Sequence, residues 1–308
     1  MLHTSHTHQH PHRDAGFSLP ELLVSLLVLS VIVGTVTQLS MQMSNGQRTM
    51  WNRTQMHSSV RGAIALLQQE VGQAGLISLP GVVTLTSAVG LGPQTVGVSS
   101  ASGMFVGERL VVGTGSVQES VTVTAVNAGT NQITAFFQLS HASGEKVQVL
   151  GGFAQGIVPS NMANGSTGTV LKMFGDVNDD GQMVYVEYTC STVTGRLSRN
   201  MMAWNAASKP ALTTENVLLS NVVANPSGGA CFSYQLETVS PNTYVTAIAV
   251  TLSVQTQDIA PVTRQYQIET KTLLNVSPRN VFQVWQLASI AETNRIQPMP
   301  PSILVLLQ

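Results

Sequence analysis

The sequence predicts an α+β protein with one long N-terminal helix followed by a β-rich globular head. Three observations support this: an apolar run near the start, an amphipathic segment directly after it, and short β-branched stretches separated by Gly, Asn and Ser over the rest of the chain. The chain has 308 residues, of which 26 are Gly, and only 5% are aromatic. This composition favours strands and turns over a helical bundle.

The apolar run extends from Phe17 to Val36 and has the length of about 20 residues that a transmembrane helix needs. The polar segment of residues 1–16 precedes it and ends in the small residue Gly16. A cut at Gly16 would therefore retain the apolar helix, unlike the cut after a conventional secretory signal. The one charged residue in the run is Glu21. An acid in a membrane helix usually marks a function, although the helix dipole alone also favours a carboxylate in a first turn.

The segment Gly16-Phe-Ser-Leu-Pro-Glu-Leu-Leu23 resembles the processing and methylation motif of type IV prepilins and type II secretion pseudopilins. The resemblance implies that a prepilin peptidase cleaves between Gly16 and Phe17, and that Phe17 is then N-methylated. It also implies that Glu21 pairs with the N-terminal amine of a neighbouring subunit during assembly. In lipid these two poorly solvated charges stabilise each other.

The predicted leader, residues 1–16, departs from the usual pattern of this family. Its one basic residue is Arg13, and it contains five histidines: His3, His6, His8, His10 and His12. Family leaders more often carry Lys or Arg. Histidine tracts can bind metal, but a discarded leader is a poor place for a metal site.

An amphipathic segment continues the helix beyond the apolar run. Apolar residues recur there at steps of three and four: Met56, Val60, Ile64, Leu67, Val71 and Ala74. We expect one helix over 17–75, with its first 20 residues or so in the membrane and Gly75 as its C-cap. Gly34, Gly46 and Gly62 are the positions at which it would bend or break. From Phe17 to Ala74 an unbroken helix would measure about 87 Å.

The length of the chain and two further segments resemble particular members of the family. Gly46–Leu76, and more weakly Ser277–Asn280, are similar to PilW-type minor pilins and to the J-type pseudopilin of type II secretion systems. The resemblance implies a pilin-like fold in which the helix carries the head. We predict that residues 76–95 and 151–308 form this head and that residues 96–150 form an inserted β module.

The alternation of apolar and polar residues indicates where strands lie. Val121, Val123 and Ala125 alternate with threonines, as Val184, Val186 and Tyr188 do with Tyr185 and Glu187, and the segments 247–254 and 262–274 are further candidates. The apolar end of the chain, Ile303–Leu307, is too short to cross a membrane. We expect it to be an edge strand or a contact for a partner.

The two cysteines, Cys190 and Cys231, are interpreted through the compartment of the head. In a cytosolic chain they would be two unrelated buried thiols. In an exported chain a structural disulfide is favoured. Since the N-terminal motif predicts export, we predict a disulfide.

The segment Asp176–Glu187 fits the calcium-loop pattern D-x-[DN]-x-[DN]-G-x5-E. Asp176, Asn178, Asp180 and Glu187 would supply side-chain oxygens and Gln182 a backbone carbonyl. The flanking residues predict strands where an EF-hand would have helices. The same residues also make a polar hairpin turn without metal, so both interpretations stand.

The sequence contains no catalytic motif, and we expect neither an enzyme nor an organic cofactor. Of the histidines outside the leader, His57 and His141, each is expected to be a surface residue. A formal net charge of −1 gives no reason to expect nucleic-acid binding.

Together these patterns predict a minor pilin that helps to prime or cap a type IV pilus. The alternative is a J-type minor pseudopilin, and a membrane-anchored periplasmic enzyme or binding protein is a third, weaker alternative. The expected partners are other minor pilins, the major pilin, the prepilin peptidase and the inner-membrane assembly platform. The expected location is the bacterial inner membrane, crossed once, with the head in the periplasm before the subunit joins a filament.

Overall fold

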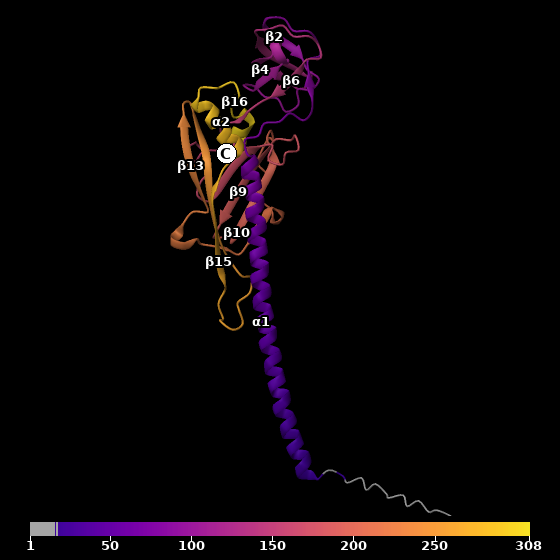
Figure 1. Ribbon diagram of the computed structural model, residues 1–308, viewed down its shortest axis with the longest axis vertical. Helices are drawn as coiled ribbons and strands as arrows, with labels where there is room; N and C mark the ends of the chain where they lie inside the picture. Colours follow the sequence, from indigo (N-terminus) through magenta and orange to yellow (C-terminus); the bar gives the residue numbers. More distant parts are fainter. Residues whose placement is uncertain (1–15, 17) are drawn as a thin grey trace, which may run out of the picture.

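A computed structural model describes residue 16 and residues 18–308. Its main feature is the helix α1, Leu19–Gln73, which extends far beyond the head like a stalk (Figure 1). Residues 1–15, with the leader histidines, and Phe17 lie outside the described residues.

The other elements form sheets and two short helices. The other α-helices of the described residues are α2 (Arg279–Ser289) and α3 (Pro301–Leu306). The strands up to residue 153 are β1 (Val83–Thr84), β2 (Gly92–Gly97), β3 (Arg109–Val112), β4 (Glu119–Asn127), β5 (Gln132–Phe137), β6 (Lys146–Val149) and β7 (Gly152–Phe153). The later strands are β8 (Val170–Gly175), β9 (Val184–Ser191), β10 (Arg196–Ala203), β11 (Val217–Ser220), β12 (Val222–Val223), β13 (Phe232–Val239), β14 (Asn242–Gln255), β15 (Ile268–Val276) and β16 (Ile296–Gln297).

The helix α1 has two halves with different surroundings, as predicted. The first half exposes its apolar side chains, and an 18-residue window with a mean hydropathy of 2.3 has no buried residue. The second half packs against the head through a buried stripe: Met56, Val60, Ala63, Leu67 and Val71. None of its glycines interrupts α1, because the helix is continuous to Gln73.

Two four-stranded antiparallel sheets form the head. One has the order β11-β10-β9-β8, and in the other β14 pairs with β12, β13 and β15. A single core joins the α1 stripe to the inner faces of both sheets, with Tyr188 on β9 and Tyr244 on β14 among its largest fully buried side chains. The helix therefore completes the core of the head.

The first sheet of the head is covered on both faces, which the strand pattern did not reveal. Tyr185, expected to alternate with core residues, is fully buried in a second core that includes Phe174 and Ile303. The edge-strand prediction for Ile303–Leu307 was wrong, because this segment lies in and just after α3; the alternative, a contact for a partner, stays a prediction. Pro301 begins that helix, and Leu307 is buried beside Ile303, with its carbonyl accepting a bond of 3.0 Å from Lys172 Nζ.

A six-stranded antiparallel sheet lies at the end of the head farthest from Leu19 (Figure 1). Its order is β1-β6-β3-β4-β5-β2, and it has its own core. The sheet begins at Val83, before the predicted module start at residue 96, because β1 pairs with β6 and β2 pairs with β5. Val121 and Val123 point inward as predicted, whereas Ala125 is exposed because the β4–β5 register shifts after Val123.

This sheet is attached to the head by apolar and polar contacts. The Phe105 ring lies 6.0 Å from that of Phe153 and 5.8 Å from that of Trp204, between ring centroids. The side chain of Gln297 accepts a hydrogen bond of 2.9 Å from the Arg109 N–H and donates one of 2.8 Å to the Arg109 carbonyl. These contacts hold the sheet at the far end of the head.

The chain turns sharply where α1 ends. Gly75 has φ +82°, and a Cβ on Gly156 would lie 2.2 Å from the Gly75 Cα, so both positions need glycine. The Asn280 side chain of α2 donates a hydrogen bond of 3.0 Å to the carbonyl of Gln73, in the last turn of α1. The end of the stalk is thereby fixed against α2.

Candidate functional site

The start of α1 has the local structure that its sequence favours. Ser18 occupies the N-cap with extended backbone angles, and Pro20 lies in the first turn, where its missing N–H costs no helical hydrogen bond. Glu21 lies in the same turn and is exposed, as are the apolar residues around it. The predicted assembly residue is therefore presented on the surface of the stalk. Gly16 is also exposed, and its partner in the predicted cut, Phe17, lies outside the described residues.

The exposed first half of α1 needs an apolar environment. Leu23, Leu27 and Val31 are each more than half exposed, together with most other apolar side chains of this segment. By length and composition it is the one helix among the described residues that can cross a membrane. Burial of one such side chain is worth about 1.5–3 kcal/mol, so water is a poor solvent for the segment and lipid or other apolar helices are good ones.

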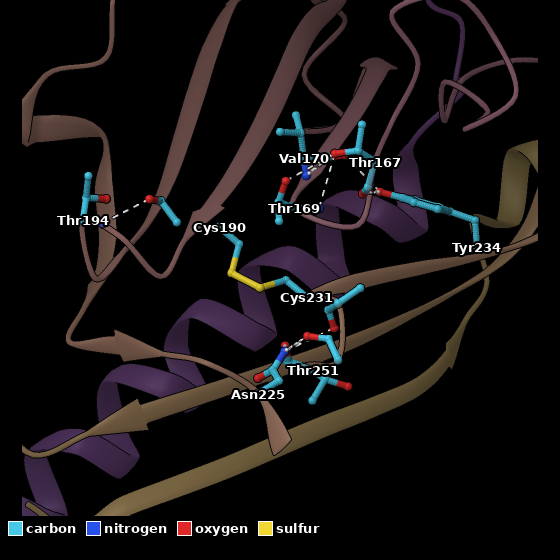
Figure 2. The surroundings of a disulfide bond; sticks show 12 residues. Thr167, Thr169, Val170, Cys190, Thr194, Asn225, Cys231, Tyr234 and Thr251 are labelled. Carbon is cyan, nitrogen blue, oxygen red and sulfur yellow. Dashed lines mark hydrogen bonds between the residues drawn. A yellow bond between two sulfur atoms is a disulfide. The ribbon is translucent and has the colours of Figure 1, made fainter. Parts of the chain in front are cut away.

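A disulfide between Cys190 and Cys231 joins the two sheets of the head (Figure 2). Cys190 is in β9, and Cys231 directly precedes β13, so the bridge crosses the core between them. Asn225 supports this place by donating a hydrogen bond of 2.8 Å to the Thr251 carbonyl, and the Thr251 N–H bonds the Cys231 carbonyl at 2.9 Å. Closing a loop of this length stabilises a fold by about 4 kcal/mol in the chain-entropy model.

A buried polar cluster fastens α1 to the first sheet. Glu70 is on the buried stripe of α1 and only 2% exposed. Its carboxylate accepts hydrogen bonds from Tyr188 Oη at 2.5 Å and Arg199 Nε at 3.1 Å, and it forms an ion pair with the Arg199 guanidinium. Burial, together with the Glu70 charge, raises the pKa of Tyr188 well above its usual range. The sequence analysis missed this cluster, although Glu70 was visible as a charge within an apolar stripe.

A second buried cluster contradicts the expectation that His141 is a surface residue. His141 is 3% exposed, with Nδ1 lying 2.7 Å from Glu145 and Nε2 lying 2.7 Å from Glu119. The bond from His141 lowers the pKa of the Glu145 carboxyl. In the fold, His141 bridges these two carboxylates, and the two contacts compensate for the burial of its ring. His57 is half-buried and pairs with Glu269 at 2.9 Å.

The residues of the predicted calcium loop form a turn and do not converge. The Asp176 carboxylate is buried and accepts hydrogen bonds from the N–H groups of Asp180 at 3.0 Å and Gly181 at 2.8 Å. Asp180 in turn accepts one of 2.9 Å from the Gln182 N–H. Gly181 has φ +80°, which suits glycine at this turn.

The fifth predicted ligand, Glu187, points elsewhere. It lies in β9, where it forms an ion pair with Lys209 at 2.8 Å and accepts a hydrogen bond from Tyr185 at 2.9 Å. Over the described residues, no group of three or more His, Cys, Asp or Glu is placed to hold a metal. The arrangement thus fits the metal-free hairpin turn, and calcium binding by Asp176, Asn178, Asp180, Gln182 and Glu187 stays an untested prediction.

One buried acid has only part of its hydrogen bonding satisfied. Glu108 precedes β3, is fully buried, and accepts a hydrogen bond of 3.2 Å from the Phe105 N–H at one oxygen. Its other oxygen has no hydrogen-bond partner among the residues that the structure describes. Burial raises the pKa of Glu108 to about 8. The stability of the fold where the six-stranded sheet meets the head is therefore expected to depend on pH.

A comparison with known families agrees with the geometry of the helix start. Residues 11–37 match the family model for the prokaryotic N-terminal methylation motif. No curated protein and no solved structure matches the chain. This match, the long apolar N-terminal helix and the β-rich head support a type IV prepilin or pseudopilin-type protein with an α+β, pilin-like fold. The motif and the helix indicate a membrane-anchored structural protein.

Proposed function

We propose that this protein is a minor pilin that acts in initiating a type IV pilus, at its priming or tip position. The observation that supports this is the six-stranded sheet at the far end of the head (Figure 1). In a helical filament each subunit must repeat the same contacts with its neighbours. An extra domain of this size is hard to accommodate at every position, whereas a subunit at the tip has no copy above it.

The assembly partners follow from this role. A prepilin peptidase in the inner membrane cuts the leader, the head resides in the periplasm, and the assembly platform passes the subunit to other minor pilins and to the major pilin. A J-type pseudopilin would have the same shape and use a type II secretion system instead. Deletion of the gene separates the two, because only one of surface piliation and protein secretion should fail.

Filament composition tests the minor-subunit role. We expect quantitative mass spectrometry of sheared filaments to find this chain far below the major subunit. We also expect its deletion to reduce filament number while the major subunit is still made and processed. Near-stoichiometric abundance in the filaments would overturn the proposal.

Replacement of Glu21 by Ala should separate processing from assembly. We expect cleavage to continue, since the change lies beyond the cut, and incorporation into filaments to fall severalfold, because the N-terminal amine of a neighbouring subunit loses its partner in an apolar environment. Immunoblotting of membranes and sheared filaments measures both steps. Ser25→Ala, a change one helical turn further along the same segment, is the control and should assemble normally. Equal incorporation of the two variants would contradict the role of Glu21.

A further inference from the structure

The hairpin formed by β14 and β15 extends beyond the head toward the start of α1. Figure 1 shows its loop alongside α1, below the head and toward the start of the helix. A groove of about 800 Å³ separates the two, with Gln47 and Trp51 of α1 on one side and Ile259 and Pro261 of the hairpin on the other. We propose that the tip of this hairpin, residues 258–266, rests on the surface of the bilayer that holds α1 and binds its anionic headgroups.

The height of the tip above the membrane fits this contact. Residues from Leu19 to Leu39 span about 30 Å of helix, the thickness of the hydrocarbon core. Gln47, which faces the groove, lies eight residues further along α1, or about 12 Å, and headgroups occupy about 5–8 Å of that distance. Val262 lies in the turn that closes this hairpin, between Ala260 and Arg264, and Figure 1 shows the hairpin loop alongside α1 toward its start. The tip is therefore placed near the level of the headgroups.

The tip also has the chemistry of a membrane surface contact. Val262 is 79% exposed, and Ile259 and Tyr266 are about half exposed. On the facing side of α1, Trp51 is 72% exposed. Aromatic side chains with one polar end are enriched at the level of lipid headgroups. These exposed apolar and aromatic side chains are more stable in contact with lipid than in water.

The charges around the tip match anionic lipid. Arg48 and Arg53 of α1 and Arg264 of the tip are exposed. The acids near them are Asp258 of the tip and Glu269, which is close to Arg53 but is paired with His57 and Lys271. Each basic residue near an anionic membrane adds about 1 kcal/mol of attraction. An apolar helix of a second subunit would also contact Ile259 and Val262, but it would not use three arginines. The observations therefore favour lipid.

The tip is ordered enough to present these groups. The Arg264 N–H donates a hydrogen bond of 2.8 Å to the Ala260 carbonyl, and the Ala260 N–H donates one of 3.0 Å to the Gln265 carbonyl. Ala260 itself is buried. A closed turn of this kind holds Val262 outward at low entropic cost.

Depth-dependent fluorescence quenching tests the contact in the full-length chain. Both native cysteines are in the disulfide, so a cysteine introduced at position 262 is the single site for a thiol-reactive fluorophore. We would reconstitute Val262→Cys in nanodiscs of phosphatidylcholine with or without phosphatidylglycerol, with spin labels either near the headgroups or at the bilayer centre. The matched control is Val82→Cys, since Val82 is 83% exposed near the far sheet. Leu29→Cys reports that α1 itself is inserted, because the proposal rests on that anchor.

We expect headgroup-level spin labels to quench position 262 severalfold more than position 82, and more strongly in anionic discs. Adding Arg264→Gln should lower the ratio of lipid-bound to free tip about fivefold in anionic discs. With Leu29→Cys quenched as expected, equal quenching at positions 262 and 82 would overturn the proposal. Quenching at position 262 that depends on the number of chains per disc and not on lipid charge would instead identify a second subunit as the occupant.

Discussion

Replacing Glu70 by Ala is expected to destabilise the head by about 3–5 kcal/mol, the usual cost of removing one partner from a buried ion pair. Arg199 and the hydroxyl of Tyr188 both donate to the Glu70 carboxylate, and both would lose their acceptor in a site that water reaches poorly. Since Glu70 is on α1 and its partners are on β9 and β10, the same change should loosen the head from the stalk. Urea denaturation in detergent, followed by circular dichroism, measures the free energy of unfolding.

A partly exposed ion pair gives the matched control. Glu269 contacts Lys271 and His57 at the surface of β15, and its replacement by Ala should cost less than about 1 kcal/mol. Limited proteolysis should then find α1 cleaved between residues 56 and 73 in the Glu70→Ala protein and not in the Glu269→Ala protein. Equal stability of the two variants would contradict the role of Glu70 in holding α1 against the first sheet.

Replacing Glu108 by Gln is expected to remove the pH dependence of stability that the Glu108 carboxyl causes. The Glu108 pKa is 4.5 in an unfolded chain and about 8 in the fold, so between these values the folded state binds more protons than the unfolded state. Stability therefore falls as pH rises from 4.5 to 8. At pH 7 the buried group costs about 3 kcal/mol relative to pH 4.5, from about 1.4 kcal/mol for each pKa unit.

The Gln side chain has nearly the same shape and no charge, so this pH-dependent cost should disappear. We compare the free energy of unfolding of the Glu108→Gln variant with that of the wild type. The difference should shift in favour of the variant by about 3 kcal/mol between pH 4.5 and pH 7. Trp204 contacts Phe105 beside Glu108, so in a background with Trp51 and Trp285 replaced by Phe its fluorescence reports unfolding where the six-stranded sheet meets the head. Glu237→Gln, at a half-buried position on the edge strand β13, controls for a change of net charge. A constant difference between the variant and the wild type from pH 4.5 to 8 would contradict the buried-acid account.

The sequence was most informative where one physical requirement dominates a long segment. The apolar run is set by the lipid that it must cross, and the stripe from Met56 to Ala74 by the head on which it packs. The helix α1 accordingly has nearly the predicted bounds. The disulfide followed from the predicted compartment, and the structure pairs the two cysteines.

Contacts between distant segments were not predictable in this way. Glu70 and Arg199 are 129 residues apart and meet only because the first sheet packs on α1. His141 was placed at the surface because its neighbours in sequence are polar, whereas the fold brings Glu119 to it. The tail was assigned by its apolar composition, whereas in the fold it is a helix whose Ile303 and Leu306 share a core with Phe174. The helix α2 was missed although Val281, Val284 and Ala288 recur at helical steps.

The central claim is that the chain is made as a prepilin whose apolar helix is kept after its leader is removed. Mass spectrometry of the protein extracted from membranes tests this most directly. We predict an N-terminal peptide that begins at N-methylated Phe17, and accumulation of the uncut chain when Gly16 is replaced by a bulky residue. Protein that keeps residues 1–16 in cells with an active prepilin peptidase would contradict the claim.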